Sequence, residues 1–578
     1  MKRISIDHLA RVEGNGGVFA TIDGHLVTEV KFVINEGPRL IEQLTVGKTP
    51  EEDVSIAPRI CAICTLSHKN AVLRAMENAL GIKVPPKVTL LRELMHMGEF
   101  IESHSLHVYY LALPDYVGFP NAIAMASKFS FEVKIALEMK QFGNHIMEIL
   151  SGRFIHGENP VIGGFGRYPT RNELIAIKNR AIQFMPFVHR TVELFCGLDF
   201  PESPEADTIY ACCEPGNDQY GLWGDEIILS TGEKLARDDY KSLTNEFFVP
   251  HSLCKRSRYK GNTYSVGALA RVNILGERLE GEAASMYKKY FNTRWRKNPL
   301  YHNAAQALEI VYCFERIPEL VDEILKVPEN PALVPSKTKN GKGTGLVEAP
   351  RGLLIHHYEI KDGLVSNVDI ITPTAQNAEE IERYCYIAAQ KLLDEGQEDK
   401  IRDRMDLVVR AFDPCISCSV HMAEVKRAPE EDWKKKLTEI KNLEPIFIGV
   451  GTKGHSDDRA GLELAQELRK AGVKKVYLES EIDADHILEG NPQNPLVFLD
   501  VIHMGEKPGK IALLPLQHVF WNSVLSHRLL PSVSSRLSYG QIKTSYILGI
   551  QPESIKEGTG ASSAVKEAIE KILEEIKS

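Results

Sequence analysis

The chain has 578 residues, of which 43 % are hydrophobic and 25 % are charged, and its formal net charge is -9 at pH 7. This length predicts more than one domain with full hydrophobic cores, and the negative charge argues against nucleic acid or an anionic membrane as a partner. No run of eighteen or more apolar residues occurs and the first residues lack the apolar segment of a signal peptide, so we expect no membrane span and a cytoplasmic location.

The ten cysteines are too sparse for a disulfide framework in a chain of this length. Four of them form two CxxC pairs, Cys61 with Cys64 and Cys415 with Cys418. The other six show no cluster spacing and are typical of buried small apolar residues. We therefore expect no iron-sulfur cluster within this chain.

Residues 1–35 alternate apolar and polar side chains around a turn at Asp23-Gly24, which predicts a β-hairpin. Just before the hairpin stands the segment Arg11-Val12-Glu13-Gly14. The carboxylate of Glu13 fits two interpretations. It is either a residue at a strand edge or, beside a metal, a group that takes up a proton and releases it in a later step.

The segment PRLIEQLTVGKTPEED, which contains Glu42, leads into Arg59-x-Cys61-x-x-Cys64-x-x-x-His68. On its own, Glu42 is typical of an exposed helical residue. Apolar residues at helical spacing follow Cys64 and predict a helix. The first amides of that helix would face the thiolates and stabilise their charge.

Between residues 88 and 198, long amphipathic patterns predict a helical bundle that can enclose a buried site. Asp115, in HSLHVYYLALPD, is there either a satisfied core group or a functional carboxylate. The stretch 200–280 is less informative, and one further helix precedes the strand APRGLLIHHYEI. This strand carries Arg351, for which a salt-bridged turn is the simplest interpretation.

The second cysteine pair lies in Asp413-Pro414-Cys415-x-x-Cys418-x-x-His421. Two CxxC pairs brought together by folding offer four sulfur ligands to a soft metal. Structural zinc sites usually gather their ligands within a few dozen residues, because a small domain needs the metal to fold. Pairs this far apart indicate instead a site inside a core that exists already, although structural zinc and two separate redox pairs stay open as alternatives.

Together these two motifs resemble the signatures of the nickel-iron hydrogenase large subunit. The resemblance covers residues 1–421 and implies a mainly α-helical bundle with small α+β parts. It implies that Cys61 and Cys415 are terminal nickel ligands, and that Cys64 and Cys418 bridge nickel to an iron that carries CO and CN.

The same resemblance assigns roles to five further positions. Glu13 matches the proton-relay glutamate of the family's RxEGH motif, with Asn15 where His is usual. Glu42 and the histidine His421 match ligands of a magnesium or iron ion. Asp115 matches an aspartate in the canopy over the metals, and Arg351 an arginine above their open positions.

The substrate that follows from the resemblance is H2, split into protons and electrons. Because no cysteines are left for clusters, the electrons would pass to a separate iron-sulfur small subunit, and from there to further electron-transfer subunits. The final acceptor stays undecided among a nicotinamide cofactor, a deazaflavin and another redox protein. A non-catalytic structural subunit of the same fold is the alternative, and the presence of all four cysteines argues against it.

The chain continues for 157 residues beyond His421 (578 minus 421). Residues 422–444 are predicted to be a charged linker that is partly helical after Pro429. Residues 445–578 alternate short apolar runs with helices, which predicts an α/β doubly wound domain. Gly449-x-Gly451-x-x-Gly454 meets the dinucleotide fingerprint. Two aspartates at the start of the next helix, Asp457 and Asp458, argue against a pyrophosphate there.

Three residues of this domain, Asp458, Asp500 and His527, form a mixed oxygen and nitrogen ligand set. The stretch around them resembles the hydrogenase maturation endopeptidase. The resemblance implies that these residues sense nickel and that the peptidase cuts between His421 and Met422, within a set of maturation factors that load the metals. The alternative is a fusion that persists as an uncleaved, inactive assembly precursor.

Overall fold

The structure is a computed structural model of the chain. It describes residues 2–34, 36, 40–201, 206–216, 218–249, 251–327, 329–336, 338–420, 433–452, 456–481, 494–502, 507–515, 545–554 and 560–577. The chain divides into two compact units, Met1–Met422 and Ala423–Ser578. Among the described residues, no helix is both long enough and apolar enough to cross a membrane.

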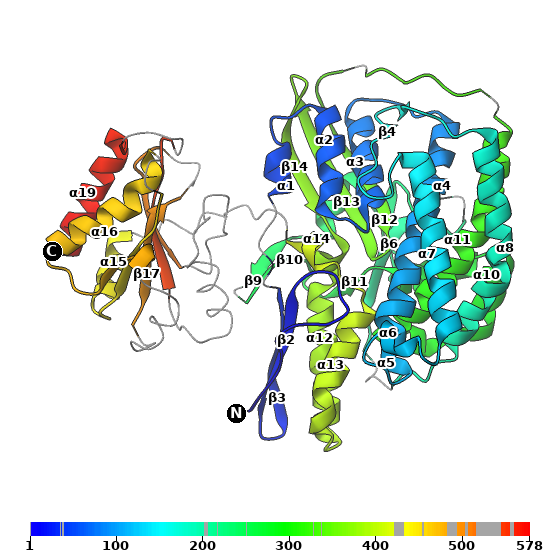
Figure 1. The fold of residues 1–578 in the computed structure, drawn as a ribbon, viewed down its shortest axis with the longest axis horizontal. Helices are drawn as coiled ribbons and strands as arrows, with labels where there is room; N and C mark the ends of the chain where they lie inside the picture. The colour runs from blue at the N-terminus through cyan, green and yellow to red at the C-terminus, as the bar shows by residue number, and fades with distance from the viewer. Residues whose placement is uncertain are drawn as a thin grey trace. The chain divides into compact units, whose positions relative to one another are not determined.

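Four long helices form the bundle of the first unit, and they stand side by side in Figure 1. They are α4 (Pro86–Ser105), α7 (Ser130–Ser151), α8 (Arg171–Cys196) and α11 (His302–Leu325). Helices α4 and α7 cross closely because each has a glycine at the crossing: a Cβ added at Gly143 would lie 2.4 Å from the carbonyl oxygen of Gly98. The bundle predicted from the amphipathic patterns is therefore present.

An antiparallel sheet lies beside the bundle, formed by β12 (Gly341–Ala349), β13 (Gly352–Lys361) and β14 (Leu364–Ile371). Helix α3 (Thr65–Ala79) packs directly on β12. Every second residue at the start of β12 is glycine, and a Cβ at Gly343 would come within 2.2 Å of the carbonyl oxygen of Ala75. This close packing fixes the helix that follows Cys64 to the strand that leads to Arg351.

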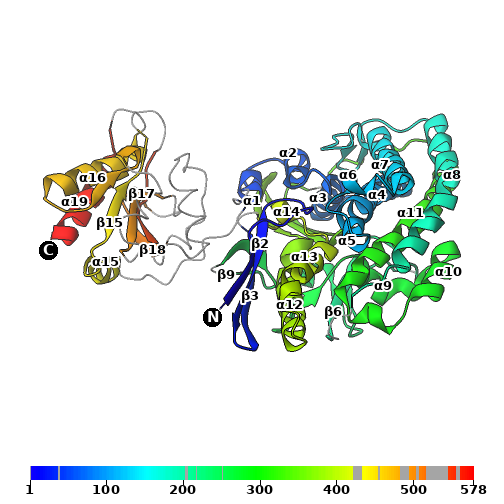
Figure 2. The ribbon, with the colours of Figure 1, turned by 60° about the horizontal axis from the view of Figure 1, so that its bottom comes forward.

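The N-terminal sheet consists of β1 (Lys2–Ile6), β2 (Gly16–Asp23) and β3 (Leu26–Ile34), paired in sequence order. The predicted hairpin turn is confirmed, with Gly24 in the left-handed region at φ 59°. Helix α12 (Pro373–Asp394) packs on β3, and the hairpin runs beside α12 and α13 (Ile401–Ala411) in Figure 2. The chain passes from α13 into the second cysteine motif and the short helix α14 (Ile416–Ser419).

In the described part of the stretch 200–280, for which the sequence was less informative, the structure has small sheets, one α-helix and two short 3-10 helices. One sheet has the order β11-β6-β7-β8, formed by β6 (Ile209–Glu214), β7 (Glu226–Leu229), β8 (Lys234–Ala236) and β11 (Tyr264–Ser265). Helix α9 (Ala268–Leu275) follows directly. It begins at Gly267, whose φ of 115° suits glycine.

The second unit holds a five-stranded sheet with the order β16-β15-β17-β19-β18. Strands β15 (Ile446–Gly449), β16 (Val476–Leu478), β17 (Leu496–Val501) and β19 (Ser545–Ile550) are parallel, and β18 (Ile511–Pro515) is antiparallel to β19. Helices α16 (Ala460–Lys470) and α19 (Ser563–Lys577) pack on each other. The α/β pattern with a mainly parallel sheet was thus predictable.

The stretch 422–444, predicted as a charged linker that is partly helical after Pro429, does contain a helix in its second half, and this helix belongs to the second unit. Residues Trp433–Lys441 form helix α15, and its side chains Leu437 and Ile440 are buried in the core of the second unit. Leu437 and Ile440 are three residues apart, which places both on one face of the helix. Residues 422–432 lie outside the described residues.

Candidate metal centre

The four paired cysteines meet in the core of the first unit. Their sulfur atoms all lie within 4.8 Å of one another, and all four residues are buried. Cys61 Sγ lies 3.6 Å from Cys415 Sγ, Cys64 Sγ lies 3.6 Å from Cys418 Sγ, and the sulfurs of Cys415 and Cys418 are 2.7 Å apart. Four convergent thiols removed from water are a donor set for soft metal ions, so the residues present fit such a centre.

Backbone contacts hold these loops in register. The amide of Cys64 donates to Cys61 Sγ at 3.1 Å, and the amide of Cys415 donates to Thr374 Oγ1 at 2.9 Å. Glu13 forms a parallel bridge with Cys415 and accepts from the Ile416 amide at 3.0 Å. Three distant segments of the chain therefore contribute backbone to one site.

The prediction for the start of α3 needs correction. The amides of Leu66 and Ser67 do not face the thiols but donate to the carboxylate of Glu99, at 2.6 and 2.9 Å. Burial raises the pKa of Glu99 to about 8, although these hydrogen bonds oppose the rise. The carboxylate occupies the N-terminal amides of α3, which leaves the Cys64 amide as the described backbone donor to a thiol from this motif.

The positive charge of Arg351 acts on the thiols. Burial opposes the ionisation of Cys61, but hydrogen bonds from the other three cysteines and attraction to Arg351 hold the pKa of Cys61 well below its ordinary value. Burial opposes the charge of Arg351. The carboxylate of Asp413 has the largest effect in the opposite direction, followed by the thiols of Cys415, Cys64 and Cys61, and together they raise the pKa of Arg351 well above its ordinary value. The guanidinium is therefore a fixed positive charge beside the sulfur atoms.

A carboxylate that the sequence reasoning passed over holds this guanidinium. Arg351 Nε donates to the carbonyl oxygen of Asp413 at 2.8 Å and to its Oδ1 at 3.1 Å, and Nη2 lies 2.9 Å from Oδ1. Among the described residues, no hydrogen-bond partner faces Nη1 of Arg351. Asp413 stands two residues before Cys415 in the quoted motif, and that adjacency was the signal that it shares the site.

Asp115, by contrast, is bound elsewhere. Its two carboxylate oxygens pair with the guanidinium groups of Arg11 and Arg410. Within the described part of the chain, no recorded contact joins Asp115 to Arg351 or to the cysteines. The structure brings Asp413, not Asp115, to the arginine beside the thiols.

Glu13 lies half-buried on another side of the site. Its carboxylate accepts from the Ser417 amide at 3.1 Å and from Ser417 Oγ at 2.5 Å. Ser417 Oγ also lies 2.9 Å from Glu36 Oε1. Because Ser417 lies between the cysteines of the second pair, these contacts place two carboxylates one residue away from the thiols.

Glu42 is buried, which contradicts the exposed helical position expected of it without the family resemblance. Its Oε1 accepts from the Ile370 amide at 2.7 Å and lies 3.3 Å from Lys255 Nζ. Burial raises the pKa of Glu42 to about 7, although Lys255 opposes the rise. His421, the other predicted ligand of a second ion, lies outside the described residues, as does Met422.

In the second unit, Asp458 and Asp500 are buried. Asp458 lies in the segment after β15, and Asp500 lies near the end of β17, the parallel strand next to β15. Within the described residues, Asp458 Oδ1 has no hydrogen-bond partner, and Asp500 Oδ1 accepts from the Val501 amide at 2.7 Å. The loop after β15 is tight, because a Cβ at Gly451 would lie 2.2 Å from the carbonyl oxygen of Asp458. His527 and Gly454 lie outside the described residues.

Asp457, next to Asp458, has a structural role, because its carboxylate binds the backbone of another segment. Its carboxylate accepts from three backbone amides, those of Glu553, Ser554 and Ser562, at 2.7, 3.0 and 2.6 Å. These bonds outweigh burial and lower the pKa of Asp457. Asp457 therefore fastens the segment between β19 and α19, and the sequence did not distinguish it from its neighbour.

Comparison with known proteins decides the family. The sequence profile of nickel-dependent hydrogenases matches residues 39–135 and 231–421. The alpha chain of sulfhydrogenase 1 from Pyrococcus furiosus is 41 % identical over 423 residues, which cover 73 % of this chain and 98 % of the relative. The chain belongs to the nickel-dependent hydrogenase family. Its first unit is a hydrogenase large subunit, an oxidoreductase component whose cysteine motifs fit a nickel-iron site.

Other relatives agree with this hydrogenase assignment. One subunit of the F420-non-reducing hydrogenase vhu from Methanocaldococcus jannaschii is 31 % identical, and the match covers 68 % of this chain and 99 % of the relative. The solved structure of an NAD+-reducing [NiFe]-hydrogenase in the H2-reduced state superposes with a TM-score of 0.66 at 27 % identity, covering 73 % of this chain and all of that one. The profile of the hydrogenase maturation protease matches residues 484–578, so this hydrogenase subunit carries a maturation protease domain at its C-terminal end.

Proposed function

We propose that the first unit catalyses the reversible heterolytic oxidation of H2 at a nickel-iron centre held by its four paired cysteines. The convergence of their sulfur atoms within 4.8 Å, in a core closed to water, supports this function. Cys61 and Cys415 would hold nickel as terminal ligands, and Cys64 and Cys418 would bridge it to an iron carrying CO and CN. When bound, this centre supplies the two-electron chemistry on H2.

The protein's own groups would position the substrate and move its proton. Nη1 of Arg351 has no protein partner among the described residues, so it would be the donor available to a bound substrate. Glu13 would receive the proton, because Ser417 joins it to the loop of the second cysteine pair. Glu42 would hold a magnesium or iron ion together with His421, and its pKa of about 7 lets it lose its proton to a cation near neutral pH.

Electrons would leave through a separate iron-sulfur small subunit. A loop near the first cysteine pair supports a docking place for it: His156 Nδ1 lies 3.1 Å from Thr65 Oγ1, next to Cys64. The neighbouring Phe154 and Ile155 are 43 % and 39 % exposed. Exposed apolar side chains this close to the site are suited to a partner that must approach within electron-transfer distance.

For the second unit we propose a nickel-dependent endopeptidase that cuts the bond between His421 and Met422. The protease profile and the two buried aspartates, Asp458 and Asp500, support this activity. A buried carboxylate oxygen without a protein partner, as at Asp458, is suited to a cation. His527 would complete the ligand set. The peptidase would act after maturation factors have loaded the metals into the first unit.

The hydrogenase proposal is tested with Cys415→Ser, measured by nickel and iron content and by H2-dependent reduction of a viologen dye. Loss of nickel and of dye reduction is expected, because the serine hydroxyl is a poor ligand for a soft metal. Cys385→Ser is the matched control, since Cys385 is equally buried but lies outside the cluster. Full activity in Cys415→Ser would reject the assignment.

The peptidase proposal is tested by the intact mass of the full chain expressed with and without nickel, together with the maturation factors. Nickel-dependent loss of residues 422–578 is expected. An active hydrogenase that keeps its full mass would show that cleavage is not required, and an inactive full-length chain would favour a stalled precursor.

A further inference from the structure

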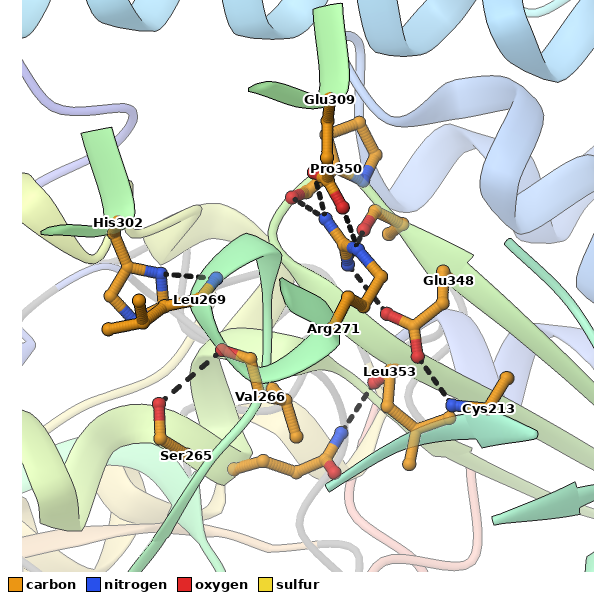
Figure 3. A network of polar contacts seen from close by, with 12 residues as sticks. Cys213, Ser265, Val266, Leu269, Arg271, His302, Glu309, Glu348, Pro350 and Leu353 are labelled. Carbon is orange, nitrogen blue, oxygen red and sulfur yellow. Dashed lines mark hydrogen bonds and ion pairs between the residues drawn. The ribbon is translucent and has the colours of Figure 1, made fainter. Parts of the chain in front are cut away.

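A second buried arginine lies behind Arg351. Arg271, on α9, is completely buried, and all three of its guanidinium nitrogens donate hydrogen bonds. Figure 3 shows its side chain between two carboxylates, Glu309 from α11 and Glu348 from β12. Nε and Nη2 donate to Glu309 at 2.5 and 2.7 Å, and Nη1 donates to Glu348 at 2.6 Å.

The two carboxylates accept further hydrogen bonds. Glu348 Oε1 accepts from the Cys213 amide at 2.7 Å, and Glu309 Oε1 accepts from the hydroxyl group of Tyr220 at 2.5 Å. Burial works against both charges, yet Arg271 lowers the pKa of Glu309 to about 2, whereas burial prevails at Glu348 and raises its pKa. Three elements that are distant in sequence thus meet at one guanidinium in a geometry that leaves it little freedom.

The remaining hydrogen bonds of Arg271 reach the backbone just before Arg351. Nη1 donates to the carbonyl oxygen of Ala349 at 3.2 Å, and Nη2 donates to that of Pro350 at 3.1 Å. Ala349 and Pro350 are the first two residues of the turn Ala349–Gly352, which joins β12 to β13 and in which Ala349 pairs with Gly352. The guanidinium therefore holds two consecutive carbonyl groups of the turn that carries Arg351.

The start of α9 also supports this turn. Gly352 has a φ of 137°, and a Cβ there would come within 2.7 Å of the amide nitrogen of Gly267. A Cβ at Gly267 would in turn lie 3.0 Å from the carbonyl oxygen of Arg351. The helix that carries Arg271 and the turn that carries Arg351 are packed backbone against backbone.

A buried ion pair is a weak source of stability, because desolvation offsets the attraction between the charges. Its specific effect is geometric: a planar fork with five donors fixes the groups around it. We propose that Arg271 is a positioning residue that sets the turn Ala349–Gly352 and thereby aims the guanidinium of Arg351 at the four-cysteine site. The expected effect on catalysis rests on the proposed hydrogenase function. The effect of Arg271 on the structure of the turn does not.

The first test measures amide hydrogen exchange in the full chain prepared without nickel. In Arg271→Lys, peptides covering residues 349–352 should exchange at least about tenfold faster, because lysine is a point donor that cannot hold two carboxylates and two carbonyls together. Arg92→Lys is the matched control. Arg92 is also buried, binds Glu77 through two nitrogens and the carbonyl oxygen of Val161, and has no described contact with the turn.

The second test uses nickel-loaded protein and a double-mutant cycle with Arg351→Lys. Arg271→Lys should lower kcat for H2 oxidation by about tenfold with KM for H2 within about twofold, because a misaimed guanidinium affects the reacting geometry more than access. In the Arg351→Lys background, Arg271→Lys should cause no further loss. If Arg271→Lys yields no folded protein, Glu348→Gln keeps the shape of the network and should show the same changes at smaller size.

Equal exchange of residues 349–352 in Arg271→Lys and Arg92→Lys would overturn the inference, and so would equal losses of kcat in both backgrounds. A wild-type chain with full nickel and iron that does not oxidise H2 would overturn the proposed function instead. The exchange measurement on nickel-free protein then still decides whether Arg271 sets the turn.

Discussion

Arg351 Nε donates to Asp413 twice, to the backbone carbonyl oxygen at 2.8 Å and to Oδ1 at 3.1 Å, although the two residues are 62 positions apart in the sequence. Asp413 stands in the left-handed region at φ 49°, two residues before Cys415. The bond to the carbonyl fixes the backbone of this loop, and the bond to the carboxylate fixes the guanidinium. One side chain thus couples the turn after β12 to the loop that carries the second cysteine pair.

This coupling predicts the behaviour of Arg351→Lys. Lysine keeps the charge but cannot make both contacts with Asp413 and also present a free N–H edge to the thiols. We expect H2 oxidation to fall by at least about tenfold, as for the loss of one preorganised charged donor, with nickel content unchanged. Arg256→Lys is the control, because Arg256 is fully buried against Glu379 and Glu382 away from the cysteines. Retained activity in Arg351→Lys would contradict the prediction.

Glu13 offers a test of the proton path. Glu13→Gln keeps the contacts with Ser417 but cannot accept and release a proton, so H2 oxidation should fall by about 10²-fold, the usual contribution of general acid–base catalysis. Ser417→Ala should have a smaller effect in the same direction. Rates of dye reduction and of hydrogen isotope exchange measure both variants, and the exposed Glu29→Gln serves as control. Equal rates in Glu13→Gln and Glu29→Gln would exclude Glu13 from the path.

The metal centre could be predicted from the sequence because its ligands come in two short motifs. Each CxxC pair carries two ligands within four residues, so both halves of the site were visible without a fold. The hairpin and the α/β pattern were equally visible, since they depend on short-range periodicity. The pairing of Asp413 with Arg351 and the capping of α3 by Glu99 depend on tertiary packing, which places residues from distant segments together, and no spacing rule predicts such contacts.

Two further details depend on tertiary contacts that the sequence does not show. Asp115 and Asp413 are both aspartates near family motifs, and only the fold determines which of them meets Arg351 and which is taken by Arg11 and Arg410. Helix α15 lies in a stretch whose many charged residues are typical of a linker. Two buried side chains, Leu437 and Ile440, suffice to attach it to the second unit.

Asp53 predicts a pH dependence of stability in the first unit. It is fully buried on α2 (Pro50–Ile56), its carboxylate has no hydrogen-bond partner among the described residues, and burial, reinforced by Glu52, raises its pKa to about 8. An unfolded aspartate has a pKa of about 3.9. Between these two pH values the folded chain binds the proton of Asp53 more tightly than the unfolded chain does. The contribution of Asp53 to the free energy of unfolding is therefore highest below about pH 4 and decreases as the pH rises to about 8.

Asp53→Asn removes this titration. We expect the melting temperature of the variant to decrease less than that of the wild type between pH 5.5 and pH 8.5, as measured by thermal unfolding of the full chain. Asp399→Asn, at an exposed position, should follow the wild-type decrease. A parallel decrease in Asp53→Asn and wild type would show that the carboxylate does not bind its proton in this range.

The neighbouring aspartates of the second unit predict two different phenotypes. Asp458→Asn removes a charge from a buried oxygen that has no described protein partner, so it should abolish nickel-dependent cleavage while the unit stays folded. Asp457→Asn weakens three backbone hydrogen bonds, and the loss of a charge-assisted acceptor costs about 1–3 kcal/mol, so it should lower the melting temperature of this unit. Intact mass and thermal unfolding of the full chain measure the two effects.

Glu467→Gln, at a half-buried position of α16, is the control for both measurements and should change neither. Because the two aspartates are adjacent, a general disturbance of the loop would give them one shared phenotype. Separate phenotypes require that one carboxylate fastens the segment before α19 and that the other faces a cation. Normal cleavage in Asp458→Asn would remove this residue from the nickel-sensing set and leave Asp500 and His527 to be tested alone.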